Sequence, residues 1–304
     1  MKRRFLLLFT LTVVIMTACA QQLYVGSYNI RYQNDGDKRD GNGWTQRCPV
    51  LCNQVLFEHP DIFGAQEVLW SQIDDMLSQL QDYDYIGRGR DDGEHAGEHA
   101  AIFYDRQRLK LLDHGDFWLS ETPEKPTLGW DAACIRICTW GKFRLRHSRR
   151  TFYFFNLHMD HVGKAARREG AKLVVQRIRE IAKNKPVVLT GDFNVDQNDE
   201  IYHIFLDSDI LDDTYEEAKV LFAENGTFNA FDPELRTFSR IDHVFVSTNF
   251  EVDRYGVLTN SYWMEGDESG EMKKAKNAPQ EINFSRYVRR LPSDHYPVFV
   301  HLRF

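Results

Sequence analysis

The sequence predicts an α/β (α+β) fold in which mixed β-sheets are covered by helices. Short apolar strands alternate with helical stretches from Leu23 onwards. In the middle of the chain, strands follow one another with few crossover helices, which favours antiparallel pairing there. Helices occur early and late, where they can cover the sheets. The 304 residues are 42% hydrophobic, enough for a sizeable core. No composition shift marks a linker, so we predict one domain over residues 21–304, after a signal segment at residues 1–20.

The N-terminal segment has the pattern of an export signal. Basic residues at positions 2–4 precede the apolar stretch Phe5–Met16, which is too short for a typical membrane span. Ala18-Cys19-Ala20 fits a small-residue cleavage site, whereas Met16–Cys19 resembles a lipobox. We favour the first, because a lipid on Cys19 would have almost no tether before the strand that begins at Leu23. We expect an exported protein that is periplasmic, secreted or lipid-anchored, and that meets a membrane only if Cys19 is lipidated.

The first elements alternate between strand and helix. The apolar run Leu23–Ile30 predicts a strand, and apolar residues at helical spacing predict a helix over Trp44–Phe57. Pro60-Asp61 ends this helix before the short apolar strand Ile62–Ala65. Helical periodicity returns over Trp70–Leu80.

The middle of the chain is rich in strands. Apolar runs predict strands at Tyr83–Gly87, Ala100–Tyr104 and Leu109–Leu119. Prolines and a glycine predict a loop over Glu121–Trp130. The alternating segments Cys134–Arg146 and Thr151–Leu157, joined by basic turn residues, predict a hairpin.

The C-terminal part again combines a helix with strands. Helical spacing over Val162–Ala182 predicts the longest helix. Apolar runs predict strands at Val187–Thr190, Ile241–Val246, Glu251–Leu258 and Pro297–Leu302. The charged stretch Glu265–Gln280 has no apolar run, and we predict a mobile insertion there.

Four cysteines follow the signal segment. Cys48 and Cys52 lie in a predicted helix, and Cys134 and Cys138 lie four residues apart in a predicted strand. Neither spacing suits a bridge within a pair. An exported chain can form a disulfide between the pairs, but buried free thiols are the simpler interpretation. No Cys/His spacing resembles a zinc site.

The charge of the chain argues against a long polyanionic ligand. Loss of the three basic residues at positions 2–4 changes the formal charge from −7 to −10. Affinity for long nucleic acids comes largely from neutralised phosphates, so a processive nuclease is disfavoured and a small phosphoester is not. Candidates for polyanion contacts are Arg167, Arg168, Arg286, Arg289 and Arg290, although solvated charge is the simpler interpretation of each.

Polar side chains follow or precede several of the predicted strands. The turn Gly191-Asp192-Phe193-Asn194 follows the strand Val187–Thr190 and presents a carboxylate and a carboxamide two residues apart. Ser293-Asp294-His295 precedes the last strand. Metal-assisted attack on phosphorus needs such groups: acceptors for the cation, an amide to fix a water, and an imidazole facing the phosphoryl oxygens.

Four more polar residues extend this pattern. Asn29 lies near the end of the first strand, Glu67 follows Ile62–Ala65, and His158 follows Thr151–Leu157. Asp242 lies inside an apolar strand. A carboxylate there is costly unless it is paired, and a histidine is a natural partner.

Taken in order, these motifs resemble the endonuclease/exonuclease/phosphatase superfamily. The motifs are Asn29, Gln66-Glu67, Gly97-Glu98, Asn156-Leu157-His158, Gly191–Asn194, Ile241-Asp242-His243 and Ser293-Asp294-His295. The resemblance covers essentially residues 23–304. It implies a four-layer sandwich of two packed mixed β-sheets flanked by helices, with the site at one end. Members include deoxyribonucleases, abasic-site endonucleases, sphingomyelinases, inositol polyphosphate 5-phosphatases and the deadenylase/nocturnin group.

The resemblance implies a metal site and a group that handles water. Glu67 looks like the principal Mg²⁺ ligand, with Asn29 and Asp294 close to the metal. Oxygen ligands suit Mg²⁺ or Mn²⁺. Asp192 resembles the residue that orients or deprotonates the attacking water. Asn194 resembles the residue that holds this water or a phosphate oxygen.

The resemblance also implies two histidines that face the phosphate. His295 looks like the histidine at the scissile phosphate, with Asp242 fixing its tautomer and favouring its charged form. His158 looks like the second, with Glu98 as its carboxylate partner. The implied reaction is in-line attack by water on a phosphoester, with the metal and the charged histidine stabilising developing charge.

Other side chains are candidates for substrate contact. Trp118 and Trp130 lie in or beside loops and could stack on a base or sugar, although a tryptophan next to a strand is more often a core residue. Arg136 is a candidate for a substrate phosphate, because its side chain opposes the cysteine face of its strand. The remaining histidines without such support are predicted to be surface residues: His99, His114, His161 and His203.

Local alternatives exist for single motifs. Asp192-Phe193-Asn194 by itself also fits an Asx turn, Glu67 an exposed acid ahead of a helix, and Asp294 the start of a strand. The presence of all the motifs in order favours a phosphoesterase site.

The substrate stays open, because one fold carries many functions. A phosphodiesterase or phosphomonoesterase acting on a nucleotide, sugar phosphate or lipid headgroup ranks level with an exported nuclease. An abasic-site endonuclease is disfavoured by the export signal, the acidic charge and His158, where that group typically has tyrosine. No apolar hairpin of a sphingomyelinase is evident. Gly87–Asp91 and Trp118–Pro123 resemble the deadenylase/nocturnin group, but export disfavours an mRNA substrate. A non-catalytic binding module would have a broken site. No obligate protein partner is evident.

Overall fold

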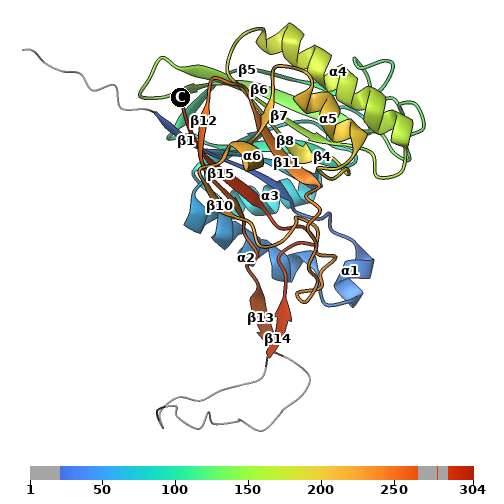
Figure 1. Ribbon diagram of the computed structural model, residues 1–304. Coiled ribbons are helices and arrows are strands. Elements are labelled where there is room, and N and C mark those ends of the chain that lie inside the picture. The colour runs from blue at the N-terminus through green and yellow to red at the C-terminus, as the bar shows by residue number, and fades with distance from the viewer. Residues whose placement is uncertain (1–20, 266–278, 280–286) are drawn as a thin grey trace, which may run out of the picture.

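The computed structural model describes residues 21–265, 279 and 287–304. Two large mixed β-sheets pack face to face, and helices lie on their outer faces (Figure 1). This is the predicted four-layer arrangement, and the predicted fold class is confirmed. The predicted signal segment, Arg286 and most of Glu265–Gln280 lie outside the described residues.

The first sheet has seven strands in the order β10-β12-β15-β1-β2-β4-β3. Their bounds are β1 (Gln22–Asn29), β2 (Ile62–Val68), β3 (Tyr83–Ile86), β4 (His99–Asp105), β10 (Val220–Phe222), β12 (Glu251–Val257) and β15 (Val298–Arg303). Helices α2 (Trp44–Glu58) and α3 (Trp70–Gln79) cover its outer face, where Leu51 and Met76 belong to one buried cluster with Phe63.

The second sheet has six strands in the order β5-β6-β7-β8-β11-β9. Their bounds are β5 (Leu109–Trp118), β6 (Ile137–Leu145), β7 (Thr151–His158), β8 (Val187–Asp192), β9 (Asp212–Asp213) and β11 (Asp242–Val246). Helices α4 (Lys164–Ala182) and α5 (Glu200–Leu206) lie on its outer face (Figure 1). The short helices α1 (Asp35–Arg39) and α6 (Thr214–Glu217) lie in connections.

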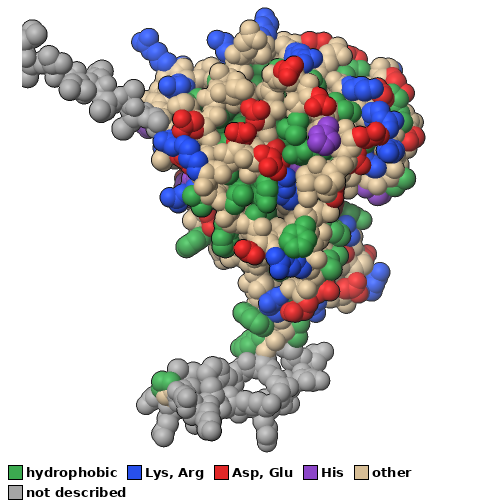
Figure 2. Space-filling model, viewed as in Figure 1, with side chains coloured by type: hydrophobic (Ala, Val, Ile, Leu, Met, Phe, Trp, Pro, Cys, Tyr) green, Lys and Arg blue, Asp and Glu red, His purple; other side chains and the backbone are tan. Residues whose placement is uncertain are grey.

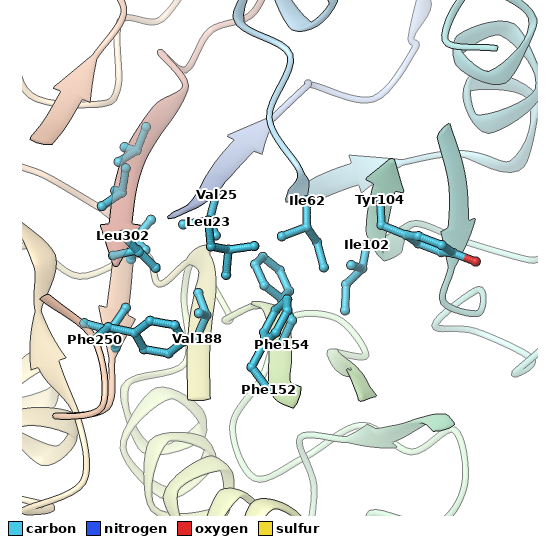
Figure 3. Packing of buried hydrophobic residues seen from close by; sticks show 14 of the residues in the cluster. Leu23, Val25, Ile62, Ile102, Tyr104, Phe152, Phe154, Val188, Phe250 and Leu302 are labelled. Atoms are coloured by element: carbon cyan, nitrogen blue, oxygen red, sulfur yellow. The ribbon is translucent and has the colours of Figure 1, made fainter. Parts of the chain in front are cut away.

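The main core lies between the two sheets. Figure 3 shows Val25 and Ile62 of the first sheet facing Phe154 and Val188 of the second. These side chains are fully buried, and burial of a side chain of this size contributes about 1.5–3 kcal/mol of transfer free energy.

A polar layer joins the sheets close to the site. Asn156 Nδ2 donates to the carbonyl oxygens of Ala65 and Ala101 in the opposite sheet, both at 2.9 Å. Gln66 Nε2 donates to Asn156 Oδ1 at 2.7 Å. Gly64 is required beside this layer, because a Cβ there would collide with the side chains of Asn156 and Thr190. These hydrogen bonds set the position of one sheet's strand ends relative to the other's.

Two parallel strand pairs bring the predicted site residues to one end of the sandwich. β1 runs parallel to β2, so that Asn29 and Glu67 both lie where these strands end. β7 runs parallel to β8, with His158 paired opposite Asp192. On the other side of β8, Asp242 of the antiparallel strand β11 is paired with the same Asp192.

One projecting element was not predicted. Strands β13 (Tyr262–Glu265) and β14 (Tyr287–Arg290) form a two-stranded ribbon that extends from the body (Figure 1). Trp263 is 62% exposed on it, and Tyr287 and Val288 are also exposed. Figure 2 shows hydrophobic groups at this ribbon. The ribbon was not predicted because its two strands lie far apart in the sequence.

The structure also bears on the predicted state of the cysteines and on the presence of membrane-spanning helices. All four cysteines after the signal segment are free thiols, and Cys48, Cys52 and Cys138 are buried as predicted, while Cys134 is half-buried. In the part of the chain that the structure describes, no helix is long and apolar enough to cross a bilayer.

Candidate active site

A cavity of about 770 Å³ opens at the end of the sandwich where β1, β2, β7 and β8 finish. Eight predicted site residues line it: Glu67, Glu98, Arg136, His158, Asp192, Asn194, Asp294 and His295. Asn29 and Asp242 lie behind this lining and hydrogen-bond to it. The structure thus brings ten of the twelve predicted residues to one cavity.

Buried oxygen donors form one side of the site. Asn29 Nδ2 donates to Glu67 Oε1 at 3.1 Å and to Asp192 Oδ2 at 3.0 Å. Glu67 has a positive φ of 62° at an irregularity in the β2–β4 pairing. Ser293 Oγ donates to the Asn29 carbonyl oxygen at 2.6 Å, which ties the chain just before Asp294 to the end of β1.

The chemistry of these donors fits a divalent cation. Glu67, Asp192 and His158 present possible ligand atoms within 4.8 Å of one another. Burial raises the pKa of Asp294, and the nearby Glu67 charge adds to this effect although the cations around Asp294 oppose it. Carboxylate and amide oxygens suit Mg²⁺ or Mn²⁺ better than zinc. A bound cation would relieve the repulsion between Glu67 and Asp294.

Asp192 and Asn194 form both an Asx turn and part of the cavity floor. The Asn194 backbone N–H donates to Asp192 Oδ1 at 2.9 Å, so the local alternative from the sequence is confirmed as geometry. Asn194 has a φ of 52°, and its Nδ2 donates to the Met159 carbonyl oxygen at 2.9 Å. Burial and then the charge of Asp242 raise the pKa of Asp192 to about 7. A carboxylate with such a pKa can accept a proton from water near neutral pH.

His295 is held as a cation beside Asp192. Its Nδ1 lies 2.8 Å from Asp242 Oδ2, and its Nε2 lies 3.8 Å from Asp192 Oδ2. Burial lowers the pKa of His295, but the charges of Asp242 and Asp192 outweigh it and raise the pKa well above the ordinary value. The predicted pairing of Asp242 with a histidine is confirmed.

His158 differs from its predicted environment. Its Nε2 lies 3.5 Å from Asp192 Oδ2, but its Nδ1 lies 3.8 Å from Glu98 Oε2, which is too long for a hydrogen bond. Glu98 instead accepts from Arg90 Nη1 at 2.6 Å. Burial and then the charges of Arg136 and Arg90 lower the pKa of His158 well below its usual value. His158 is therefore neutral, and Glu98 is the partner of Arg90.

The two predicted tryptophans lie outside the cavity. Trp118 is 5% exposed, packs with Ala100 and Ile137, and donates from Nε1 to the Arg90 carbonyl oxygen at 2.7 Å. It is a core residue, because the end of β5 turns its ring inwards. Trp130 is half-buried on a loop and does not line the cavity. Stacking of either ring on a substrate in this cavity is not supported.

Arg136 lines the cavity as predicted, but it lies on the loop before β6 and not within a strand, because β6 begins only at Ile137. It is buried and lines the cavity, and its Nη2 lies 3.1 Å from His161 Nδ1. Arginines at this position can contact phosphate oxygens from the side of His158.

The sequence missed several cavity residues and misplaced one histidine. The missed residues include Arg31, Arg90, Phe228 and Phe231, and His161 also lines the cavity. Arg31 follows Asn29 by two residues, and Arg90 lies in Gly87–Asp91, so position alone could have suggested both. His99 is 2% exposed and was wrongly predicted to be at the surface, because its Nδ1 contacts the Val68 carbonyl oxygen across the β2–β4 pair. His114, His161 and His203 are exposed as predicted.

The four described arginines proposed for polyanion contacts do not line the cavity. Arg168 pairs with Glu200, and Arg167 donates to the Asp160 carbonyl oxygen. Arg289 and Arg290 donate to the carbonyl oxygens of Pro233 and Asp40. These contacts agree with the simpler interpretation of solvated or structural charge.

Asp160 fastens two loops beside the cavity. Its Oδ2 accepts from the backbone N–H groups of Ala133 and Cys134, and its Oδ1 accepts from those of Val162 and Gly163. Burial opposes ionisation, but these donors and Arg136 together hold the pKa of Asp160 well below its usual value.

Asp160→Asn is expected to lower the unfolding free energy by about 3 kcal/mol, because an amide N–H₂ replaces one acceptor and faces buried donors. Because the folded pKa is depressed, the wild-type advantage is full above the ordinary carboxyl pKa of about 3.9 and shrinks as pH falls below it. Urea unfolding at pH 7 and at low pH measures both effects. An unchanged midpoint at pH 7 would contradict this role.

Comparison with known proteins extends the geometric result. The sequence model of the Endonuclease/Exonuclease/phosphatase family matches residues 26–295. A solved family protein from Bacteroides thetaiotaomicron is 48% identical, with a TM-score of 0.86 over 94% of this chain and 98% of that chain. A mannosyl-6-phosphatase from Bacteroides thetaiotaomicron VPI-5482 is 48% identical, with a TM-score of 0.84 over 93% of this chain and 100% of that chain. Nocturnin of Drosophila melanogaster is 25% identical over 199 residues, which are 61% of this chain and 30% of that protein.

Proposed function

Because the chain belongs to the endonuclease/exonuclease/phosphatase family, we propose that it is a phosphoesterase that works with Mg²⁺ or Mn²⁺. One observation carries this proposal. A buried carboxylate with a pKa of about 7, Asp192, lies between the charged His295 on one side and the side chains of Asn29 and Glu67 on the other. In this arrangement Asp192 can accept a proton from water, and His295 can stabilise negative charge on a phosphoryl group.

The side chains suggest a division of labour in this reaction. Asp192 accepts the proton of the attacking water. Asn194 fixes the turn that orients the Asp192 carboxylate. His295, protonated through Asp242, donates from Nε2 to a phosphoryl oxygen. The neutral His158 supplies a further hydrogen bond, and the cationic Arg136 beyond it contacts the substrate. A divalent cation held by Glu67, Asn29 and Asp294 would act as a Lewis acid towards phosphoryl and leaving oxygens.

We propose a small phosphomonoester as substrate, with a hexose 6-phosphate as the first choice. The support is the similarity to the mannosyl-6-phosphatase, which extends over the whole of that chain. The acidic net charge favours a small substrate over a long polyanion. On the face shown in Figure 2, acidic and basic side chains are interspersed, which also offers no extended track for nucleic acid.

A panel of phosphoesters tests the reaction class and the substrate together. We expect Mg²⁺- or Mn²⁺-dependent hydrolysis of mannose 6-phosphate and p-nitrophenyl phosphate, with bis-p-nitrophenyl phosphate, DNA and RNA cleaved far more slowly. Strong, salt-sensitive DNA or RNA cleavage would favour a nuclease instead. No hydrolysis of any of the five would favour a non-catalytic binding module.

Removal of the cation is expected to abolish this activity. EDTA should stop turnover, and excess Mn²⁺ should restore it. Glu67→Gln should raise the Mn²⁺ concentration needed for half-maximal activity, because it removes a charged ligand from the proposed site. Glu180→Gln, on the exposed side of α4, is the matched control and should leave the Mn²⁺ titration unchanged. Full activity in EDTA would overturn the metal assignment.

We also propose that the chain is exported after cleavage near Ala20. The basic and apolar pattern of residues 1–20 supports this proposal. Fractionation of cells with N-terminal sequencing of the mature protein tests it. A mature protein that begins with a lipidated Cys19 would replace the soluble form by an anchored one.

A further inference from the structure

Arg47 is a fully buried cation that no step of the proposed reaction uses. It lies in α2, and its side chain has no exposure. A buried arginine normally pairs with a carboxylate, because desolvation of the charge is costly. Within the described residues, no ion pair involves Arg47. Its guanidinium is satisfied by backbone carbonyl oxygens alone.

These carbonyl oxygens belong to three separate chain segments. Arg47 Nη1 donates to Ile30 at 2.8 Å and to Pro292 at 2.9 Å. Its Nη2 donates to Arg31 at 3.1 Å, and its Nε donates to Asn42 at 2.8 Å. One planar fork therefore holds four acceptors in fixed directions, which a lysine ammonium cannot do.

Two of the three segments carry proposed metal ligands. Ile30 and Arg31 directly follow Asn29, and Pro292 directly precedes Ser293-Asp294. Arg47 and Pro292 are 245 residues apart in sequence, so no local structure fixes this contact. The Arg47 guanidinium thus joins the segments that carry Asn29 and Asp294, in addition to the Ser293–Asn29 hydrogen bond and the 3.6 Å contact between Arg31 Nη1 and Asp294 Oδ2.

The position of the guanidinium is itself well determined. Its Cζ lies 5.3 Å from the ring centroids of both Trp44 and Phe231. Trp44 is anchored by a 2.8 Å hydrogen bond from its Nε1 to Asp75 Oδ2. Phe231 lines the cavity, so the contacts of Arg47 run from helix α2 to the cavity wall.

We propose that Arg47 is a positioning residue that sets the spacing of Asn29 and Asp294 for a divalent cation. It acts through the backbone of the segments that carry these ligands and does not touch the cation or the substrate. This inference rests on the proposed metal-dependent function. Outer residues that orient metal ligands are commonly worth about 10- to 100-fold in metal affinity.

Arg47→Lys and Arg47→Met test the proposal. Arg47→Met leaves four buried carbonyl oxygens without a donor, whereas Arg47→Lys keeps a charge and three donors and is therefore the variant expected to stay folded. Arg240→Lys is the matched control. Arg240 is 4% exposed, pairs with Asp213 at 2.8 Å, and does not line the cavity.

Two readouts separate positioning from general destabilisation. Free Mn²⁺ measured by electron paramagnetic resonance gives affinity without turnover, and the rise in Tm on adding Mn²⁺ gives it a second time. Both Arg47 variants are expected to bind Mn²⁺ about 10- to 100-fold more weakly. With mannose 6-phosphate, their kcat at saturating Mn²⁺ should recover most of the wild-type value. Arg240→Lys should lose stability and keep wild-type Mn²⁺ affinity.

The outcomes distinguish this inference from the proposed function. Wild-type Mn²⁺ affinity in a folded Arg47→Lys or Arg47→Met variant overturns the positioning role, whatever the substrate. A wild-type protein that binds Mn²⁺ but hydrolyses no phosphoester refutes the function and leaves the affinity comparison decisive. A wild-type protein that binds no Mn²⁺ overturns both.

Discussion

Asp192→Asn is expected to lower kcat for phosphoester hydrolysis by about 10²- to 10⁴-fold, the range of a lost general base. The amide keeps the shape of the side chain but cannot accept a proton from water. The KM for mannose 6-phosphate should change far less, because His295, His158 and Arg136 still surround the phosphate. Steady-state kinetics with saturating Mn²⁺ measures the two constants separately.

The same substitution makes an unusual prediction about stability. Burial and the Asp242 charge raise the pKa of Asp192 to about 7, so the folded protein disfavours its ionised form. A neutral amide removes this cost but loses an acceptor for Asn29 Nδ2, so Tm should change little and the lost activity cannot be attributed to unfolding. Asp113→Asn, at an exposed position of β5 outside the cavity, is the control for both measurements. Wild-type turnover in folded Asp192→Asn would refute the role.

His295→Gln is expected to lower kcat by about 10²- to 10³-fold, the usual loss of one charge-stabilising donor in a buried site. Asp242→Asn should cause a smaller loss, because the imidazole remains but the charge that keeps it protonated does not. The double variant should be no worse than His295→Gln alone, since the two residues act as one unit. His203→Gln, at an exposed position of α5, is the matched control.

Additive losses would contradict this coupling. If Asp242→Asn multiplied the defect of His295→Gln, Asp242 would contribute through some path other than the 2.8 Å contact with His295 Nδ1. Circular dichroism and Tm of all three variants are needed, because Asp242 is fully buried and its replacement can affect folding.

The predicted fold was recovered because its determinants are local. Apolar alternation in Thr151–Leu157 and Val187–Thr190 is a property of neighbouring residues, and both segments are strands, extended only to His158 and Asp192. The ribbon of β13 and β14 was missed because each strand is short and its partner lies far along the chain. Short elements that depend on a distant partner leave little periodic signal.

In the candidate site, too, some features could be predicted from local sequence and others depended on distant residues. Asp242 was predicted to need a histidine because a lone carboxylate on an apolar strand is costly, and His295, 53 residues away, is that partner. The partner of His158 was predicted less well. Glu98 lies near both Arg90 and His158, and it accepts a hydrogen bond from Arg90 and none from His158.

The sequence by itself determined the longer strands of the two sheets, the polar residues that follow them, and hence the family and the set of candidate site residues. Those properties depend on side-chain type and spacing along the chain. Only the tertiary structure decided the charge of each histidine, the burial of Trp118, and the use of Arg47 to join segments around Asn29 and Asp294. Charge state and burial depend on which groups meet across the two sheets, and the order of residues in one strand does not contain that information.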